Sequence, residues 1–581
     1  MAFRNNWVKA LIINAIILIV ILLCTNMSYE TNDDYAMANR IVAGSPNVEF
    51  TDYFLCLILC KIQAWIPIMN VFVLFQVVFS YLAFVMITKL ALDLDRSFWI
   101  HALFVMVIAI YSFDHYAVIQ FTKTSGLLAV AGMLLIVDTI VHKRNFMYYF
   151  WALVFMYLST MLRFEMCIFP ICFAGLYLVM RLIHGRREVV SGGFLSPGRL
   201  VGYVLVLILL GGAACVHFAS DGENLKSQEL RDYIYYSTYR SYVVDYPIYE
   251  HFKEHPEEYA GIDITKNDFS LIDNWYFDYD GAASRDNLTA IKEVYDKSQT
   301  AERTSMQSAF KSCVSHIIKD MRKFDSSGIH IWILLGIALA ALIRMKPRYW
   351  WYIIAVGAGA VAFYVLLYQM GRPAYRVTEI VDISATIFLL HAFEWQHFWH
   401  GPDPEEHRGV HGVGRVFGIA ASVVMMAALC GGLWLEYNLS QDHAAQIEKR
   451  LRPVALAERI AEDQDHVYVF STREKNNTDS YAHPLKVPDP DPNVMTFGGW
   501  GTLSPYLMDR LHSYGLSNVF RDIIDNPQVY VIEDKRVDSM EEYFNRWYAD
   551  PEDGASAIRY EPVDEVDGYK IWSVVRSGEA D

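Results

Sequence analysis

Long apolar runs dominate the first three quarters of this chain. Each run is roughly 20 residues long, which is the length of a helix that crosses the hydrocarbon core of a bilayer. The pattern predicts about eleven transmembrane helices, which cover residues 8–24, 67–91, 98–112, 124–141, 147–162, 166–183, 199–218, 328–344, 349–369, 376–394 and 415–436. The sequence therefore predicts a polytopic α-helical membrane protein whose transmembrane domain spans residues 1–436.

The first apolar run has the charge pattern of a signal peptide, because Arg4 and Lys9 precede it. However, no cleavage site with small residues follows it, and many further spans do. We interpret this run as a signal-anchor helix that is retained.

Basic residues mark alternate short loops, and this asymmetry orients the spans. With a cytoplasmic N-terminus, the cytoplasmic loops and the adjoining helix ends contain Arg96, His142, Lys143, Arg144, Arg181, Arg186, Arg187, Arg199, Arg344, Lys346 and Arg348. The same orientation places two large polar regions, loop 219–327 and the tail from residue 437, on the extracytoplasmic side. We therefore expect a multi-pass protein of the plasma membrane.

The polar regions differ from the spans in their periodicity. Beyond residue 437, the strand-like segments "HVYVFST", "QVYVIED" and "YKIWSVV" are separated by helical stretches, which predicts an extracytoplasmic α/β domain over residues 437–581. Loop 219–327 is rich in tyrosine; an ordinary hydrophobic core explains these rings better than stacking on sugars does. In the first outer loop, 25–66, "TNDDYAMANRIVAG" and "FLCLILCKIQAWIP" predict amphipathic helices on the membrane surface, with Asn32 as an N-cap.

The composition fits a membrane protein, since 54% of the 581 residues are hydrophobic and only 20% are charged. The net charge of -16 arises mainly in the two large polar regions, so nucleic acid is not an expected partner. All cysteines except Cys313 lie in or beside apolar runs, which predicts no disulfide framework.

Ionisable residues gather where the spans reach the predicted outer face. Asp33 and Asp34 occupy the first turn of a predicted surface helix, where the helix dipole favours negative charge. Three further stretches, "FDHYAVIQFTK", "LRFEM" and "GRPAYRVTE", contribute Asp114, His115, Lys123, Arg163, Glu165, Arg372, Arg376 and Glu379. Solvated loop ends would explain each stretch alone, but together they predict a shared polar cavity.

On one face of the predicted helix 376–394, ionisable residues continue from the outer face into the membrane. Arg376, Glu379 and Asp382 recur every three residues, so Asp382 lies roughly 9 Å deeper than Arg376 at 1.5 Å per residue. A carboxylate at that depth needs a partner. Two interpretations stay open: a structural ion pair between helices, or the binding of an anionic group through Arg372 and Arg376.

These features together resemble the integral-membrane glycosyltransferases of the GT-C superfamily, which includes protein O-mannosyltransferases and lipid A aminoarabinose transferases. The resemblance covers the topology of residues 1–436 and the acids of the first outer loop. The Trp-Trp-Asp signature of oligosaccharyltransferases is absent. The family implies transfer of a sugar from a polyprenyl-phosphate donor to a glycan, lipid or protein acceptor on the extracytoplasmic face.

The resemblance also implies roles for individual residues. Asp33 or Asp34 would be the catalytic carboxylate, and Arg163, Arg372 and Arg376 would bind the phosphate. We include four more residues as candidates for the substrate site: Lys123, Glu165, Glu379 and Asp382.

Glycosyl transfer from a lipid phosphate requires these residue types. A carboxylate deprotonates the acceptor hydroxyl, and cations stabilise the leaving phosphate. Guanidinium groups suit a phosphate because they donate two hydrogen bonds at once. A divalent metal ion, Mg or Mn, is an open alternative; the aspartate pair or the "DYD" at 278–280 would hold it.

Two other functions stay open. A transporter or flippase of a lipid-linked saccharide would usually place its ionisable groups nearer the bilayer midplane, within repeated halves. A non-catalytic cell-surface membrane protein would need neither the aspartate pair nor the arginines.

Overall fold

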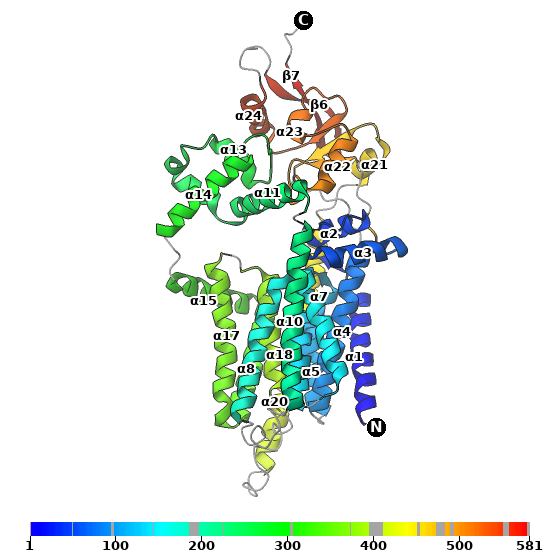
Figure 1. The fold of residues 1–581 in the computed structure, drawn as a ribbon, viewed down its shortest axis with the longest axis vertical. Helices are drawn as coiled ribbons and strands as arrows, with labels where there is room; N and C mark the ends of the chain where they lie inside the picture. The colour runs from blue at the N-terminus through cyan, green and yellow to red at the C-terminus, as the bar shows by residue number, and fades with distance from the viewer. Residues whose placement is uncertain are drawn as a thin grey trace. The chain divides into compact units, whose positions relative to one another are not determined.

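Figure 1 shows the computed structural model of the chain. It describes residues 2–48, 50–94, 98–142, 144–184, 197–224, 226–301, 306–371, 373–393, 411–449, 454–471, 483–488, 493–549 and 557–577. The chain folds into two compact units: a helical unit (residues 1–221, 305–446 and 483–488) and a mixed unit (222–304, 447–482 and 489–581). The mixed unit thus combines most of the tyrosine-rich loop with the tail, two regions that the sequence pattern presents separately.

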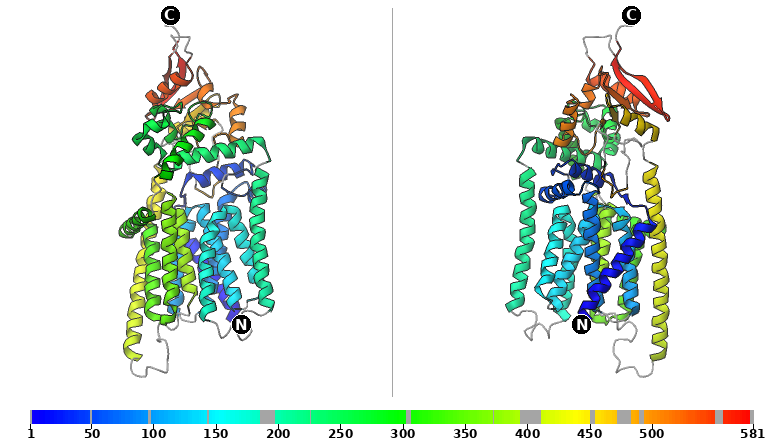
Figure 2. Two further views of the ribbon diagram at one scale, coloured as in Figure 1. Left: turned by 60° about the vertical axis from the view of Figure 1, so that its left-hand side comes forward. Right: turned by 90° about the vertical axis from the view of Figure 1, so that its right-hand side faces the viewer.

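The helical unit is a bundle of long apolar helices (Figures 1 and 2). They are α1 (Ala2–Cys24), α4 (Val71–Leu94), α5 (Phe98–Tyr116), α6 (Phe121–His142), α7 (Phe146–Arg163), α8 (Ile168–His184), α10 (Pro197–Asn224), α16 (Ser326–Arg344), α17 (Trp350–Gln369), α18 (Tyr375–His391) and α20 (His411–Glu448). Each predicted span coincides with one of these helices, to within a few residues at most ends.

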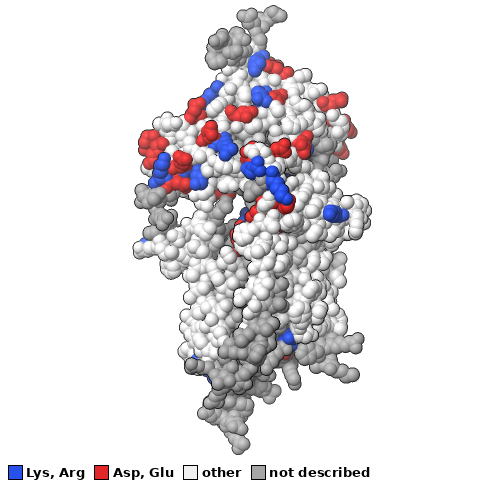
Figure 3. All heavy atoms as spheres, viewed as in Figure 1, with Lys and Arg blue, Asp and Glu red and all other residues white. Residues whose placement is uncertain are grey.

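Nine helical runs in the described part of the chain are long and apolar enough to cross a membrane. One of them, Phe146–His184, comprises α7, the short turn η1 (Phe164–Cys167) and α8. The predicted span 376–394 corresponds to α18, whose 17 residues put it at the short end of the range for a membrane-crossing helix. The expected class, a polytopic helical membrane protein, is confirmed, and the bundle side seen in Figure 3 carries few charged side chains.

Helices α6 and α18 form the centre of the bundle. Nearly all residues of α6 are buried, as is the stretch of α18 from Thr378 to Leu389. Close packing depends on small residues here: a Cβ added at Gly126 would come within 2.4 Å of Ile380. Polar side chains between Phe121 and Ile140 of α6 and between Thr378 and Leu389 of α18 are therefore shielded from solvent.

Short elements cover one end of the bundle, which we call the α2 end. The helices α2 (Asn32–Val42) and α3 (Tyr53–Trp65) lie across it, and α15 (Met306–Lys323) lies at the same end (Figures 1 and 2). Strand β1 (Ser28–Tyr29) pairs in parallel with β2 (Val118–Ile119). This pairing fixes the segment after α1 beside the segment after α5.

The start of α2 differs from the prediction by one residue. Asn32 is the first helical residue, and Thr31 is the N-cap, without a side-chain capping hydrogen bond. Met37, Ala38 and Ile41 are buried, as the amphipathic pattern predicts.

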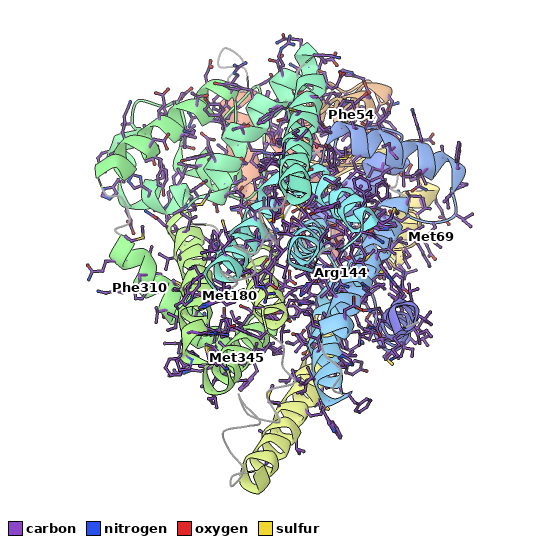
Figure 4. The ribbon with its side chains drawn as sticks, turned by 60° about the horizontal axis from the view of Figure 1, so that its bottom comes forward. Phe54, Met69, Arg144, Met180, Phe310 and Met345 are labelled. Atoms are coloured by element: carbon purple, nitrogen blue, oxygen red, sulfur yellow. The ribbon has the colours of Figure 1, made fainter. Side chains whose placement is uncertain are left out.

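Ion pairs join helices at the opposite end of the bundle. Arg144 contacts Asp93 at 2.9 Å and Asp138 at 2.7 Å, and Lys89 contacts Asp93 at 2.7 Å. In Figure 4, Arg144 lies among the helices, whereas Phe310 of α15 lies at the periphery. These four charged side chains are therefore paired within the protein.

The mixed unit contains a five-stranded sheet with the order β4-β3-β5-β7-β6. Its strands are β3 (Val467–Phe470), β4 (Val494–Thr496), β5 (Val529–Ile532), β6 (Ile558–Val566) and β7 (Tyr569–Arg576). β3 pairs in parallel with β4 and β5, whereas β7 is antiparallel to β5 and β6. The three predicted strands are confirmed as β3, β5 and β7, but β4 and β6 were missed.

Helices from both halves of the sequence belong to this unit. They are α11 (Gln228–Asp245), α12 (Ile248–Glu254), α13 (Lys266–Asp273), α14 (Arg285–Ala301), α21 (Val454–Glu462), α22 (Pro505–Ser513), α23 (Val519–Asp522) and α24 (Val537–Trp547). One core contains Tyr236 and Tyr276 of the tyrosine-rich loop together with Val469 and Val531 of the sheet. The interpretation of these tyrosines as a hydrophobic core is confirmed.

Asp278, in the "DYD" segment, lies inside the mixed unit. Its carboxylate accepts hydrogen bonds from Tyr543 (2.8 Å), from Asn518 (3.1 Å) and from Tyr548. Burial raises the pKa of this carboxyl, while the three donors oppose the shift. These hydrogen bonds give Asp278 a structural role that links the loop to the tail within one core.

We expect the substitution Asp278→Asn to destabilise the mixed unit. An amide has a single acceptor oxygen, so at least one buried donor loses its partner, at a cost of about 1–3 kcal/mol. Asp280→Asn is the matched control, because the Asp280 side chain is half exposed. Thermal unfolding of the full chain tests this, and equal melting temperatures for the two variants would contradict it.

Candidate functional site

A buried ammonium group lies at the centre of a polar cluster at the α2 end. Lys123, in the first turn of α6, has no exposed surface. Its Nζ lies 2.8 Å from Glu30 Oε2 and 3.4 Å from Asp114 Oδ1. The pairing of β1 with β2 brings Glu30, which follows β1, close to Asp114, which precedes β2. The positive charge of Lys123 and the negative charges of these two carboxylates therefore compensate one another.

Asp114 connects this ammonium group to three further helices. Its Oδ2 accepts a 2.6 Å hydrogen bond from the Tyr375 hydroxyl of α18 and lies 3.4 Å from Nε2 of His330 on α16. The same His330 nitrogen lies 4.0 Å from Glu436 Oε1 on α20. Ser326 donates a 2.9 Å hydrogen bond to the other Glu436 oxygen.

A second histidine forms a separate pair with a carboxylate. His115 Nε2 lies 3.4 Å from Glu379 Oε1, and both side chains are buried. One turn further along α18, Asp382 accepts a 2.7 Å hydrogen bond from the Tyr364 hydroxyl. The predicted need of Asp382 for a partner is thus met by a tyrosine of α17.

The two candidate catalytic aspartates have different surroundings. Asp34 is fully buried and accepts hydrogen bonds from Gln76 Nε2 (3.0 Å) and from the backbone N–H of Phe121 (2.9 Å). Burial raises its pKa well above the usual range. Asp34 therefore fixes α2 against α4 and α6.

Asp33 keeps a partly open carboxylate. Its side chain is 12% exposed, and Oδ2 lies 3.9 Å from Nη2 of Arg376. Burial raises the pKa of Asp33, and the nearby Arg376 and Arg163 guanidinium groups oppose that shift. A carboxylate with a raised pKa is a stronger base than a fully solvated aspartate, and it is therefore better suited to act as a general base.

The other predicted site residues are dispersed. Arg163 donates a 2.9 Å hydrogen bond to Thr122 and lies 3.9 Å from Glu165, whose side chain is 67% exposed. Arg372 lies outside the described residues. The structure thus brings Asp33, Arg376 and Arg163 close together, and it leaves Glu165 near the solvent.

Several members of the cluster were not singled out from the sequence. His330 and Glu436 each stand alone at the edge of an apolar run, whereas Glu30 precedes Asp33 by three residues and Tyr375 directly precedes Arg376. For His330 and Glu436, the sequence signal was an isolated ionisable residue beside hydrocarbon. Such a residue is a functional candidate by default.

A polar cavity of about 660 Å³ opens beside this cluster. It is lined from α5, α15, α16, α17, α18 and α20, and its lining includes the acids Glu30, Asp114, Asp320, Asp325, Glu436 and Asp442. Among the described lining residues there is no lysine or arginine. The cavity is therefore acidic, and burial raises the pKa of the Asp320 carboxyl in its wall.

An apolar groove of about 600 Å³ lies mainly on α5, α16 and α20, which also line the cavity, and Leu390 of α18 lies at it. Ile110 lines the groove one turn before Asp114, and Leu435 precedes Glu436. On α16, Ile329 of the groove follows Ser326 of the cavity. Successive turns of these helices therefore line first an apolar surface and then a polar one.

Two clusters in the described residues have the spacing of metal ligands, with ligand atoms within 4.8 Å of one another. One is Asp114, His330 and Glu436, all buried. The other is Asp52, His217 and Asp221, in which His217 lies 3.0 Å from Asp52 and Asp221 is 53% exposed. Burial raises the pKa of Asp52 to about 6, and the nearby His217 opposes that shift.

Fold and site define a polytopic helical membrane protein with buried ionisable groups at one end of its bundle. Comparison with models of known protein families, with curated protein sequences and with solved structures gave no match to this chain.

We expect Lys123→Met to destabilise the helical unit strongly. Methionine preserves the buried volume but leaves Glu30 and Asp114 without their cation, which costs about 3–5 kcal/mol for a buried pair. The melting temperature in detergent should fall, and adding Glu30→Gln should restore part of the loss. Lys61→Met, at an exposed position of α3, is the control; equal melting temperatures for the two methionine variants would refute the role of Lys123.

Proposed function

We propose that this protein is a membrane glycosyltransferase that takes a sugar from a polyprenyl-phosphate donor and transfers it to an acceptor hydroxyl at the α2 end. The observation that carries the proposal is the succession of apolar groove and polar cavity along α5, α16 and α20. A lipid-linked sugar has a long apolar tail, which would match the groove, and a polar head, which would match the cavity. The resemblance to the GT-C superfamily supports the same assignment.

In the proposed reaction, Asp33 is the general base. Its carboxylate takes the proton of the acceptor hydroxyl while the acceptor oxygen forms a bond to the anomeric carbon of the sugar. The bond from that carbon to the phosphate oxygen breaks, and the lipid phosphate leaves with the electron pair. Arg376 and Arg163 are close enough to Asp33 to influence its charge, so they can also stabilise the leaving phosphate.

The proposal makes Asp33, and not Asp34, the reacting group. Consecutive residues of a helix point about 100° apart, so only one of the two acids can face the reaction. Asp34 already accepts two hydrogen bonds in the bundle, whereas Asp33 keeps a partly exposed carboxylate beside a guanidinium group.

We expect Asp33→Asn to lower transfer of labelled sugar by about 10²-fold or more with folding intact, because an amide cannot accept the proton. The base must be ionised, so the wild-type rate should fall as the pH decreases through the raised pKa of Asp33. Asp33→Glu should recover part of the rate. Glu565, exposed in the mixed unit, provides the control Glu565→Gln, and wild-type turnover by Asp33→Asn would refute the assignment.

A flippase of lipid-linked saccharides is the second candidate, because the groove and the cavity would also suit transport of an amphiphile. The two functions differ in whether a bond is broken. The transferase releases a free lipid phosphate in detergent, without any bilayer. A flippase instead moves an intact fluorescent donor across liposomes, and Asp33→Asn would not abolish that movement.

We further propose that the α2 end and the mixed unit face the extracytoplasmic side of the plasma membrane. Cysteines introduced at Glu565 in the mixed unit and at Arg348, between α16 and α17, test this. An impermeant maleimide added to intact cells should label the first, and the second only after permeabilisation. The four exposed native cysteines, Cys24, Cys172, Cys215 and Cys430, are first replaced by serine; the reverse pattern would overturn the orientation.

A further inference from the structure

Three ligand-type side chains from three different helices converge beside the acidic cavity. Asp114 lies near the end of α5, His330 in the second turn of α16 and Glu436 in the last third of α20. All three are more than nine-tenths buried, with exposures of 3%, 0% and 2%. Burial of two carboxylates and an imidazole at one point is costly unless something compensates the charge.

Two of the three facing atoms of this cluster have no hydrogen-bond partner among the described residues. Within the described part of the chain, neither His330 Nε2 nor Glu436 Oε1 has a hydrogen-bond partner. Tyr375 donates its hydroxyl proton to Asp114, so its oxygen is free to accept from His330 Nδ1 at 3.4 Å. In the tautomer with its proton on Nδ1, the neutral ring of His330 presents the Nε2 lone pair to the two carboxylate oxygens, as a metal ligand requires.

The spacing fits a shared ion better than direct hydrogen bonds. His330 Nε2 lies 3.4 Å from Asp114 Oδ2 and 4.0 Å from Glu436 Oε1, both beyond the usual hydrogen-bond length of about 2.9 Å. Ligands bound at about 2.1 Å in a tetrahedron lie about 3.4 Å apart. Glu436 Oε1 would have to move closer to the other two ligand atoms, all of which already lie within 4.8 Å of one another.

The charge balance around the cluster favours a cation. Glu30 and Asp114 contact the buried ammonium of Lys123, whereas Glu436 interacts with that ammonium only at longer range and lies 4.0 Å from His330. The described lining of the adjoining cavity adds Asp320, Asp325 and Asp442 but no lysine or arginine.

We infer that Asp114, His330 and Glu436 bind one divalent transition-metal ion, Zn²⁺ or Mn²⁺. The imidazole nitrogen favours these ions over Mg²⁺ and Ca²⁺, which prefer oxygen ligands. Three protein ligands leave at least one coordination position for an anionic or hydroxyl-bearing ligand in the cavity, the arrangement of a catalytic rather than a structural metal site. The site does not depend on the proposed function, whose steps use no metal ion.

Metal content of the purified full-length protein tests this inference. The protein is stripped with EDTA in detergent, dialysed against Zn²⁺ or Mn²⁺ and analysed by mass spectrometry. We expect about one ion per chain, and an affinity at least about 10²-fold lower in His330→Gln and Glu436→Gln. Mg²⁺ alone should not compete at equal concentration.

The pair of His115, beside Asp114 on α5, and Glu379 on α18 provides a matched control with the same 3.4 Å separation. Among the described residues, no third ligand-type side chain completes a metal-ligand group with this pair. His115→Gln and Glu379→Gln should therefore retain the ion. A wild-type protein that binds neither Zn²⁺ nor Mn²⁺ would overturn the site, whether or not the variants fold. Loss of the ion in Asp52→Asn together with retention in Glu436→Gln would also overturn it, because the ion would then belong to the Asp52 and His217 cluster.

Discussion

The contact between the buried Lys123 ammonium and two carboxylates is the interaction on which the α2 end depends. Glu30 and Asp114 can remain charged inside the bundle because Nζ lies within 3.4 Å of both. Asp114 in turn accepts from Tyr375 and approaches His330. One buried cation thus links the segment after α1 with α5, α6, α16 and α18, and any ligand of the cavity meets a preorganised set of side chains.

Charge is divided between two regions of this end. The cavity wall is acidic, whereas the guanidinium groups of Arg163 and Arg376 lie near Asp33. An anionic phosphate would therefore be repelled by the cavity wall unless a cation were present, and it would be attracted to the arginines. Glu30, three residues before Asp33, lines the cavity, so the two regions lie close together along the chain.

The sequence predicted the spans well because hydropathy is a local property of about 20 residues. It could not distinguish Asp33 from Asp34, because the choice depends on Gln76 and the backbone of Phe121, which belong to other helices. Lys123 was recognisable as unusual, but its partner Glu30 was not, since their contact requires the pairing of β1 with β2. Strand β6 was missed because many of its side chains are exposed and polar, so its apolar alternation is weak.

His115 and His330 are both buried beside carboxylates at this end, but they differ in the number of carboxylates that they face. His115 faces one carboxylate, Glu379, so a single proton can neutralise that pair. His330 faces two, and the ammonium nearest to them is already shared with Glu30. A proton on His330 would compensate only one of its two neighbours, and it would leave distances too long for strong hydrogen bonds. A divalent ion compensates both carboxylates and accepts the lone pair of the imidazole, which explains why three helices place these atoms around one point.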